Sequence, residues 1–174
     1  MSLTETLIQE FERESATTRR VLERVPADKL TWKPHPKSMS IGELALHIAE
    51  EPAALAPTAL TGGIDFGKHV SVRQPATASE ILGNHDAGVM IVTNVLRQLG
   101  DAGLQRTWNA TINGAPYFSV PLAAFVRNVL LNHIYHHRGQ LSVYLRLLDV
   151  PVPAIYGPSA DEAPFAAHQT AATA

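Results

Sequence analysis

The chain of 174 residues contains no cysteine. This absence excludes disulfides, thiolate metal ligands and a cysteine nucleophile, so any metal ion has to be bound by nitrogen or oxygen atoms. A chain without cysteine also gives no sign of an oxidising compartment, and we therefore expect a cytoplasmic protein.

Long runs of charge and long hydrophobic runs are missing as well. Charged residues make up 17% of the chain, the net charge is −2, and the longest basic run is Arg19-Arg20. Binding to nucleic acid depends on a basic surface that faces the phosphates, so we expect no nucleic-acid partner. No apolar stretch approaches the roughly 20 residues of a membrane span, and the first residues lack the features of a signal peptide. We therefore expect no membrane partner.

Apolar periodicity is the main feature that the sequence does contain. Hydrophobic residues make up 45% of the chain, which is enough for one well-buried core in a single domain. Capping signals at Ser2, Ser40 and Thr77 precede three periodic segments, and Pro121 suits the first turn of a fourth. The predicted helices cover residues 3–25, 41–60, 78–100 and 121 to about 149. Pro52 and Pro57 are expected to kink or break the second helix.

The remaining segments contain turn and loop signals. Residues 62–75 are predicted to form a loop, whereas Asn113-Gly114 predicts the turn of a small hairpin, with Pro116 weakening its return arm. The predicted fold class is therefore all-α, a four-helix bundle with a small hairpin before the last helix. Such bundles build cofactor sites from side chains on facing helices.

Two histidines interrupt the apolar stripe of the last predicted helix. His133 and His137 are four residues apart and so share one helix face, with Cβ atoms roughly 5–6 Å apart. Two imidazoles at this spacing are a common local signature of a transition-metal site. They stand among apolar residues at helical spacing: Leu122, Val126, Val129, Leu130, Leu141, Tyr144, Leu145 and Leu148.

His47 is the best candidate for a third ligand. It lies in an apolar stretch of the second helix, and the second and fourth helices of a bundle can face each other. Three histidines would leave a coordination position open, as in catalytic rather than structural metal sites. The competing interpretation is that each histidine is a hydrogen-bonded core residue.

Other polar residues carry weaker signals. His85 lies on an apolar stripe and is expected to line a pocket or to pack in the core. Glu50, three residues after His47, could accept a hydrogen bond from a metal-binding histidine or act as a general base. A solvated position on the helix surface is the simpler interpretation. Gln140 could orient a ligand or substrate, and Arg138 could pair with a carboxylate between subunits.

With these residues in view, the sequence resembles the DinB/YfiT-like superfamily of four-helix-bundle metalloproteins. The resemblance extends from the first helix to about Pro158. It rests on the segments Leu30-Thr31-Trp32-Lys33-Pro34, Ser40-Ile41-Gly42-Glu43-Leu44-Ala45-Leu46-His47-Ile48, His133-Ile134-Tyr135-His136-His137-Arg138-Gly139-Gln140 and Pro151-Val152-Pro153 with Tyr156-Gly157-Pro158.

The resemblance implies an up-down-down-up type of bundle over residues 1–158. The Ala-rich tail at residues 159–174 departs from the family pattern, and we expect it to be loosely ordered. The resemblance also implies a homodimer and a divalent metal ion, nickel or zinc, bound by His47, His133 and His137. Members with known activity resemble thiol-dependent transferases or isomerases that use glutathione, mycothiol or bacillithiol, and many other members have no assigned reaction.

The favoured hypothesis is a metal-dependent enzyme that acts on a small-molecule substrate. The open position on the metal would take water or the sulfur of a low-molecular-weight thiol and lower its pKa. The first case describes a hydrolase and the second a thiol-dependent transferase, which is preferred through the resemblance alone. The alternative is a non-catalytic bundle that binds a metal or a small molecule.

Overall fold

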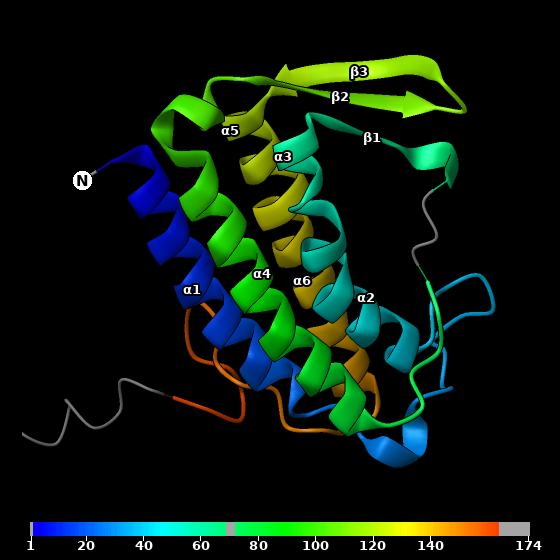
Figure 1. The fold of residues 1–174 in the computed structure, drawn as a ribbon. Helices are drawn as coiled ribbons and strands as arrows, with labels where there is room; N and C mark the ends of the chain where they lie inside the picture. Colours follow the sequence, from blue (N-terminus) through cyan, green and yellow to red (C-terminus); the bar gives the residue numbers. More distant parts are fainter. Residues whose placement is uncertain (1, 69–71, 164–174) are drawn as a thin grey trace, which may run out of the picture.

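The computed structural model describes residues 2–68 and 72–163, most of which are helical. Four long helical segments lie side by side (Figure 1). They are α1 (Leu3–Leu22), α2 (Ile41–Leu55), α4 (Ala78–Leu104) and a continuous helix made of α5 (Leu122–Phe125), a π-helical segment (Val126–Leu131) and α6 (Asn132–Leu147). The four predicted helices are thus confirmed, whereas the up-down-down-up order of their directions stays a prediction.

The predicted capping residues begin the first three helices. The Ser2 and Thr77 hydroxyls accept hydrogen bonds from the third residue after them. Ser40 forms a complete capping box, because its hydroxyl accepts from the Glu43 N–H and the Glu43 carboxylate accepts from the Ser40 N–H. These bonds satisfy N–H groups that the helix itself leaves without acceptors.

Short elements complete the connections. A 3₁₀ turn (Ala27–Lys29) follows α1, a single turn α3 (Thr58–Thr61) follows α2, and a second 3₁₀ turn (Phe66–Lys68) precedes α4. Pro52 lies inside α2, which continues to Leu55, so the helix does not break there. The chain is interrupted only near Pro57, which precedes α3. Within the described residues, no helix has both the length and the hydropathy of a membrane span.

The all-α prediction is corrected by a three-stranded sheet at one end of the bundle (Figure 1). The predicted hairpin is present as β2 (Thr107–Ile112) and β3 (Ala115–Pro121), with Asn113 and Gly114 at positive φ in the turn. The unforeseen strand is β1 (Gly63–Asp65), which pairs in parallel with β2 inside the segment predicted to be a loop.

Two local contacts hold β1 in place. A Cβ atom at Gly63 would lie 2.2 Å from the Asn109 carbonyl oxygen, so only glycine permits this pairing. The Asp65 carboxylate accepts hydrogen bonds from the backbone N–H groups of Gly67, Asn113 and Gly114 at 2.8–3.1 Å. A three-residue strand held in this way carries no periodic signal in the sequence.

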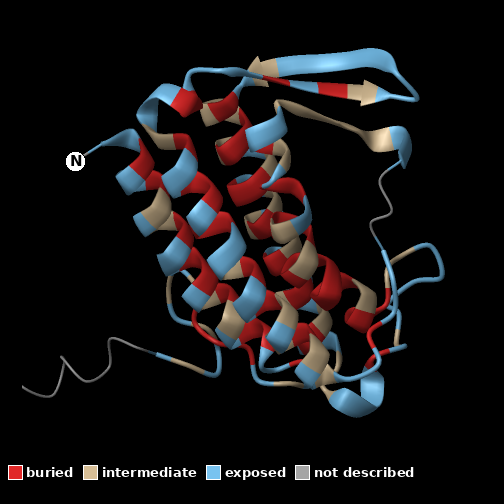
Figure 2. Ribbon diagram, viewed as in Figure 1, coloured by how far each residue is buried: buried red, intermediate tan, exposed pale blue. Residues whose placement is uncertain are grey.

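The core consists of two apolar clusters along the inward faces of the helices (Figure 2). Near the sheet, the fully buried Trp108 stacks on Phe125 with 4.3 Å between ring centroids, and its indole N–H donates to the Thr58 hydroxyl. The other cluster includes Ile41, Ile81 and Leu141.

The segment after α6 returns to the bundle through polar contacts. The Asp161 carboxylate accepts from Arg146 and from the Val152 N–H, and the Glu162 carboxylate accepts from Arg20. The expected loose tail is therefore bonded to the bundle as far as Glu162, and the rest of it, residues 164–174, lies outside the described residues. The division of the chain at residue 158 stays a prediction.

Arg138 is a core residue. Its side chain is 1% exposed and donates to the Glu14 carboxylate at 2.7 Å, to the Thr18 hydroxyl and to the Tyr156 hydroxyl. The carboxylate that it pairs with thus belongs to α1 of the same chain, which corrects the suggestion of pairing between subunits. Hydrogen bonds on both partners offset the free energy that burying two charges costs.

We expect the Glu14→Ala substitution to lower the free energy of unfolding by about 3–5 kcal/mol, because it leaves a buried guanidinium without its counter-charge. Urea denaturation measures this change. The matched control is Glu12→Ala on the same helix, since Glu12 faces Arg97 at 3.7 Å with both side chains about half exposed. The control should cost less than about 1 kcal/mol, and equal losses in the two variants would contradict the prediction.

Candidate metal centre

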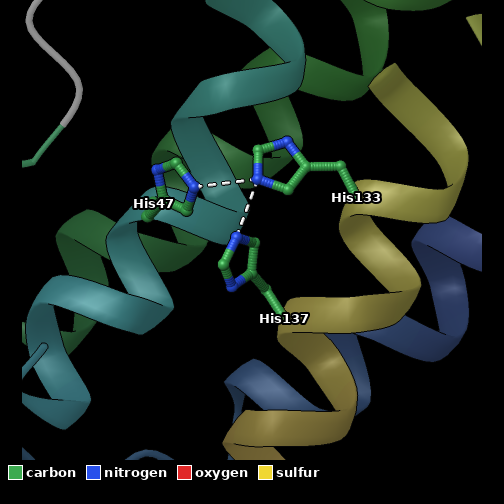
Figure 3. A group of neighbouring side chains, drawn as sticks. All are labelled: His47, His133 and His137. Atoms are coloured by element: carbon green, nitrogen blue, oxygen red, sulfur yellow. Dashed lines mark hydrogen bonds between the residues drawn. The ribbon is translucent and has the colours of Figure 1, made fainter. Parts of the chain in front are cut away.

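Three histidines from two facing helices meet between α2 and α6 (Figure 3). His47 belongs to α2, and His133 and His137 belong to α6. One ring nitrogen from each lies within 4.8 Å of the others. The structure therefore brings together the three histidines that the sequence singled out.

The Nε2 atoms point toward one another. The Nε2 atom of His133 lies 3.2 Å from that of His47 and 2.7 Å from that of His137. Nitrogen ligands at roughly 2.0–2.1 Å from a tetrahedral ion are about 3.3–3.4 Å apart from one another. The His47–His133 spacing is close to this value, the His133–His137 spacing is shorter, and ring nitrogens of His47 and His137 lie within 4.8 Å of each other.

The opposite edges of the rings face hydrogen-bond acceptors. Nδ1 of His137 lies 2.8 Å from the side-chain oxygen of Gln140, and His133 hydrogen bonds with the backbone of Val129. Nδ1 of His47 lies 3.8 Å from the Glu51 carboxylate. When the ring protons are held on the Nδ1 edges, three Nε2 lone pairs face one another. A cation satisfies such a group, and the donor set therefore fits a metal ion.

The electrostatics of the pocket favour neutral imidazoles. Burial, with smaller contributions from the His137 and His47 rings, lowers the pKa of His133 from its ordinary 6.5 to about 4. Burial is also the main cause of the lowered pKa of His137. Desolvation penalises the charged form of an imidazole, and the neutral form is the one that binds metals.

The pocket around the histidines is small and mostly apolar. Its free volume is about 10 Å³, close to the minimum that holds one water molecule. The lining residues come from both apolar clusters of the core and from the histidine group: His47, Ile48, Glu51, Pro52, Val129, Leu130, His133, Ile134 and His137. In this conformation the pocket has room for an ion and not for a larger substrate.

A π-helical segment lies directly before the His133 turn. The Asn132 N–H bonds to the carbonyl of Arg127, five residues earlier, one residue more than in an α-helix. After it, Ile134 and Arg138 are buried, each one position later than a histidine of the predicted stripe, whereas Leu141 and Leu145 are buried as predicted. His133 and His137 consequently lie half-buried at the edge of the buried face. Segments of this kind occur frequently at functional sites.

The weaker sequence candidates have different positions. His85 is buried and lines a separate small cavity with Ser15 and Gly88, so it is not part of the histidine group. Glu50 accepts from Asn84 and pairs with Arg73, away from the three rings. Gln140 does orient a histidine, as its bond to His137 shows.

Glu51 is the residue that the sequence interpretation missed. It is 8% exposed and lies four residues after His47, which places both side chains on one helix face. Glu50, three residues after His47, is equally well placed on that face by its spacing alone. Only the packing of α2 decides that Glu51 points into the pocket and Glu50 does not.

Comparisons with known proteins agree with this fold. The chain is similar to the uncharacterized protein YrdA of Bacillus subtilis, with 24% identity over 157 residues that cover 89% of each chain. A crystal structure of a DinB-like protein from Bacillus cereus superposes with a TM-score of 0.69 at 25% identity, covering 87% of this chain and 97% of the other.

A second crystal structure, of the DinB-like protein YjoA from Bacillus subtilis, has a TM-score of 0.68 at 20% identity, covering 86% of this chain and 96% of the other. At that identity the likeness supports the fold alone. The DinB family profile matches residues 1–165, nearly the whole chain. The chain therefore belongs to the DinB family.

Proposed function

We propose that this protein binds a divalent metal ion through His47, His133 and His137 and uses it as an enzyme. The observation that carries the proposal is the convergence of three Nε2 atoms, with the opposite edge of His137 bonded to Gln140 and His133 bonded to the Val129 backbone. A group of neutral histidines that only packed in a core would have to direct a ring proton to an acceptor at each contact.

Each residue of the centre has a distinct task in this proposal. His133 lies between the other two rings, and Gln140 keeps the His137 ring in place through Nδ1. An ion held by three imidazoles supplies Lewis acidity, which lowers the pKa of a water or thiol that reaches its open position. Nickel and zinc both suit imidazole ligands, and we propose them as the candidate metals.

For the reaction, we favour the transfer of a low-molecular-weight thiol to an electrophilic small molecule over hydrolysis. The resemblance to thiol-dependent transferases supports this choice. Because the chain has no cysteine, the sulfur nucleophile would have to arrive with a cosubstrate. Gln140 is exposed and bonds to His137, so reactants would approach from the solvent on this side of α6.

A non-catalytic metal-binding bundle is the second candidate, and the small free volume of about 10 Å³ in the pocket favours it. Assays of the metal-loaded protein with a panel of thiols and electrophiles distinguish the two. Turnover that is lost in His137→Ala supports the enzyme. The homodimer and the cytoplasmic location stay predictions, and sedimentation equilibrium tests the first of them.

We expect His47→Ala, His133→Ala and His137→Ala each to weaken zinc or nickel binding by more than about 100-fold, beyond the usual effect of losing an indirect partner of a ligand. Isothermal titration of metal-free protein measures the affinity, and circular dichroism should show nearly unchanged helix content. His136→Ala is the matched control, because His136 is exposed and lies outside the group. Stoichiometric tight binding in all three variants would refute the proposed site.

We also expect the stability of the metal-free protein to depend on pH through His133. Its folded pKa of about 4 lies below the ordinary 6.5, so the unfolded chain binds the proton more readily. The resulting contribution to stability is complete above about pH 6.5 and is lost as the pH falls toward 4.

Urea unfolding of the metal-free protein between pH 7.5 and pH 4.5 measures this dependence. Wild type should lose stability more steeply on acidification than His133→Ala, which lacks the titrating ring. Parallel pH profiles for the two proteins would show that His133 is not desolvated in the way that the structure indicates.

A further inference from the structure

His47 has a buried nitrogen atom that no hydrogen bond satisfies. Among the described residues, its Nδ1 atom has no hydrogen-bond partner. A carboxylate oxygen of Glu51 lies 3.8 Å away, too far for a hydrogen bond. Both side chains are almost entirely buried, with exposed fractions of 8% for His47 and 11% for Glu51.

The other two histidines, His133 and His137, already have hydrogen-bond partners. Gln140 already lies at hydrogen-bond distance from Nδ1 of His137, and Val129 bonds to His133 through its backbone. Such partners fix the tautomer and the orientation of a histidine that binds a metal. His47 is thus the one ring of the three whose acceptor is close but not yet in contact.

Charge gives Glu51 a second reason to be in this pocket. Three neutral imidazoles leave the double positive charge of a divalent ion without compensation, and a buried charge without a partner is costly. Glu51 is the one carboxylate among the described residues that line the pocket. Its position on the same helix face as His47 places negative charge beside the ion without occupying one of the three nitrogen positions.

We propose that Glu51 is a positioning residue for the metal centre, an inference that rests on the metal-binding function proposed above. When the ion is bound, the Glu51 carboxylate accepts a hydrogen bond from Nδ1 of His47 and holds Nε2 toward the ion. The gap of 3.8 Å closes through a small rotation of the two side chains on α2. Glu51 therefore tunes the affinity of the site for the metal ion, whereas the three histidines are the ligands that binding requires.

The experiment compares Glu51→Ala, Glu51→Gln and Glu50→Gln by zinc affinity in a chelator competition with metal-free protein. Glu51→Ala should weaken zinc binding about 10- to 100-fold, the range seen when an indirect partner of a ligand is removed. Glu51→Gln should recover part of this loss, because its amide oxygen still accepts from His47. Glu50→Gln changes the neighbouring carboxylate, which bonds to Arg73 and Asn84, and should leave the affinity unchanged.

A second measurement separates positioning from a structural role. Urea unfolding of the metal-free proteins should show Glu51→Gln, which keeps the shape of the side chain, to be about as stable as wild type. Affinity and metal-free stability that fall together would instead assign Glu51 to the fold and overturn the proposal. Losses in Glu51→Gln as large as in His47→Ala would make Glu51 a direct ligand, which also overturns it.

The metal centre and the role of Glu51 can be tested separately. An unchanged zinc affinity in Glu51→Ala, together with a lost affinity in His47→Ala, removes the role of Glu51 and keeps the metal centre. An unchanged affinity in both variants removes the centre itself.

Discussion

Three imidazole rings approach one another closely in a small, mostly apolar pocket, and this contact constrains what the site can bind. Burial makes the charged forms of His133 and His137 unfavourable, and the neighbouring rings would repel a proton on His133. Neutral rings in turn place lone pairs toward one another at 2.7 Å and 3.2 Å. Such a group could hold a cation other than a proton.

The bundle enforces this approach by fixing the rotation of α6. Arg138 directly follows His137, and its buried guanidinium is bonded to Glu14 and Thr18 on α1. Successive residues of a helix point about 100° apart, so a side chain held against α1 leaves the one before it directed elsewhere. The His137 ring consequently faces α2, where the capping box at Ser40 fixes the start of the helix that carries His47.

Two polar side chains lie beside the histidines at different distances. Gln140 is in hydrogen-bond contact with His137, whereas Glu51 lies 3.8 Å from His47. We expect the distance between Glu51 and His47 to shorten when an ion binds. The pocket has almost no free volume, so larger movements of its side chains have no room. Chemistry on a larger molecule would then take place at the solvent side of His137 and Gln140 rather than inside the bundle.

Local signals in the sequence were sufficient for the helices and for the identity of the three histidines. Caps, helical periodicity, the Asn113-Gly114 turn and the four-residue spacing of His133 and His137 are properties of short segments, and each is confirmed in the structure. The geometry of a four-helix bundle extended this to the expectation that the helices of His47 and His137 face each other.

Contacts between distant segments decided the rest. β1 exists because Gly63 permits a close approach to Asn109 and Asp65 caps the turn of the hairpin, and neither contact leaves a periodic trace. In the first turns of α6, after the π-helical segment, Ile134 and Arg138 are buried instead of the predicted His133 and His137, which places Arg138 in the core. The choice of Glu51 over Glu50 likewise required the packing of α2, because residues three and four positions from His47 are equivalent by spacing and differ only in what surrounds them.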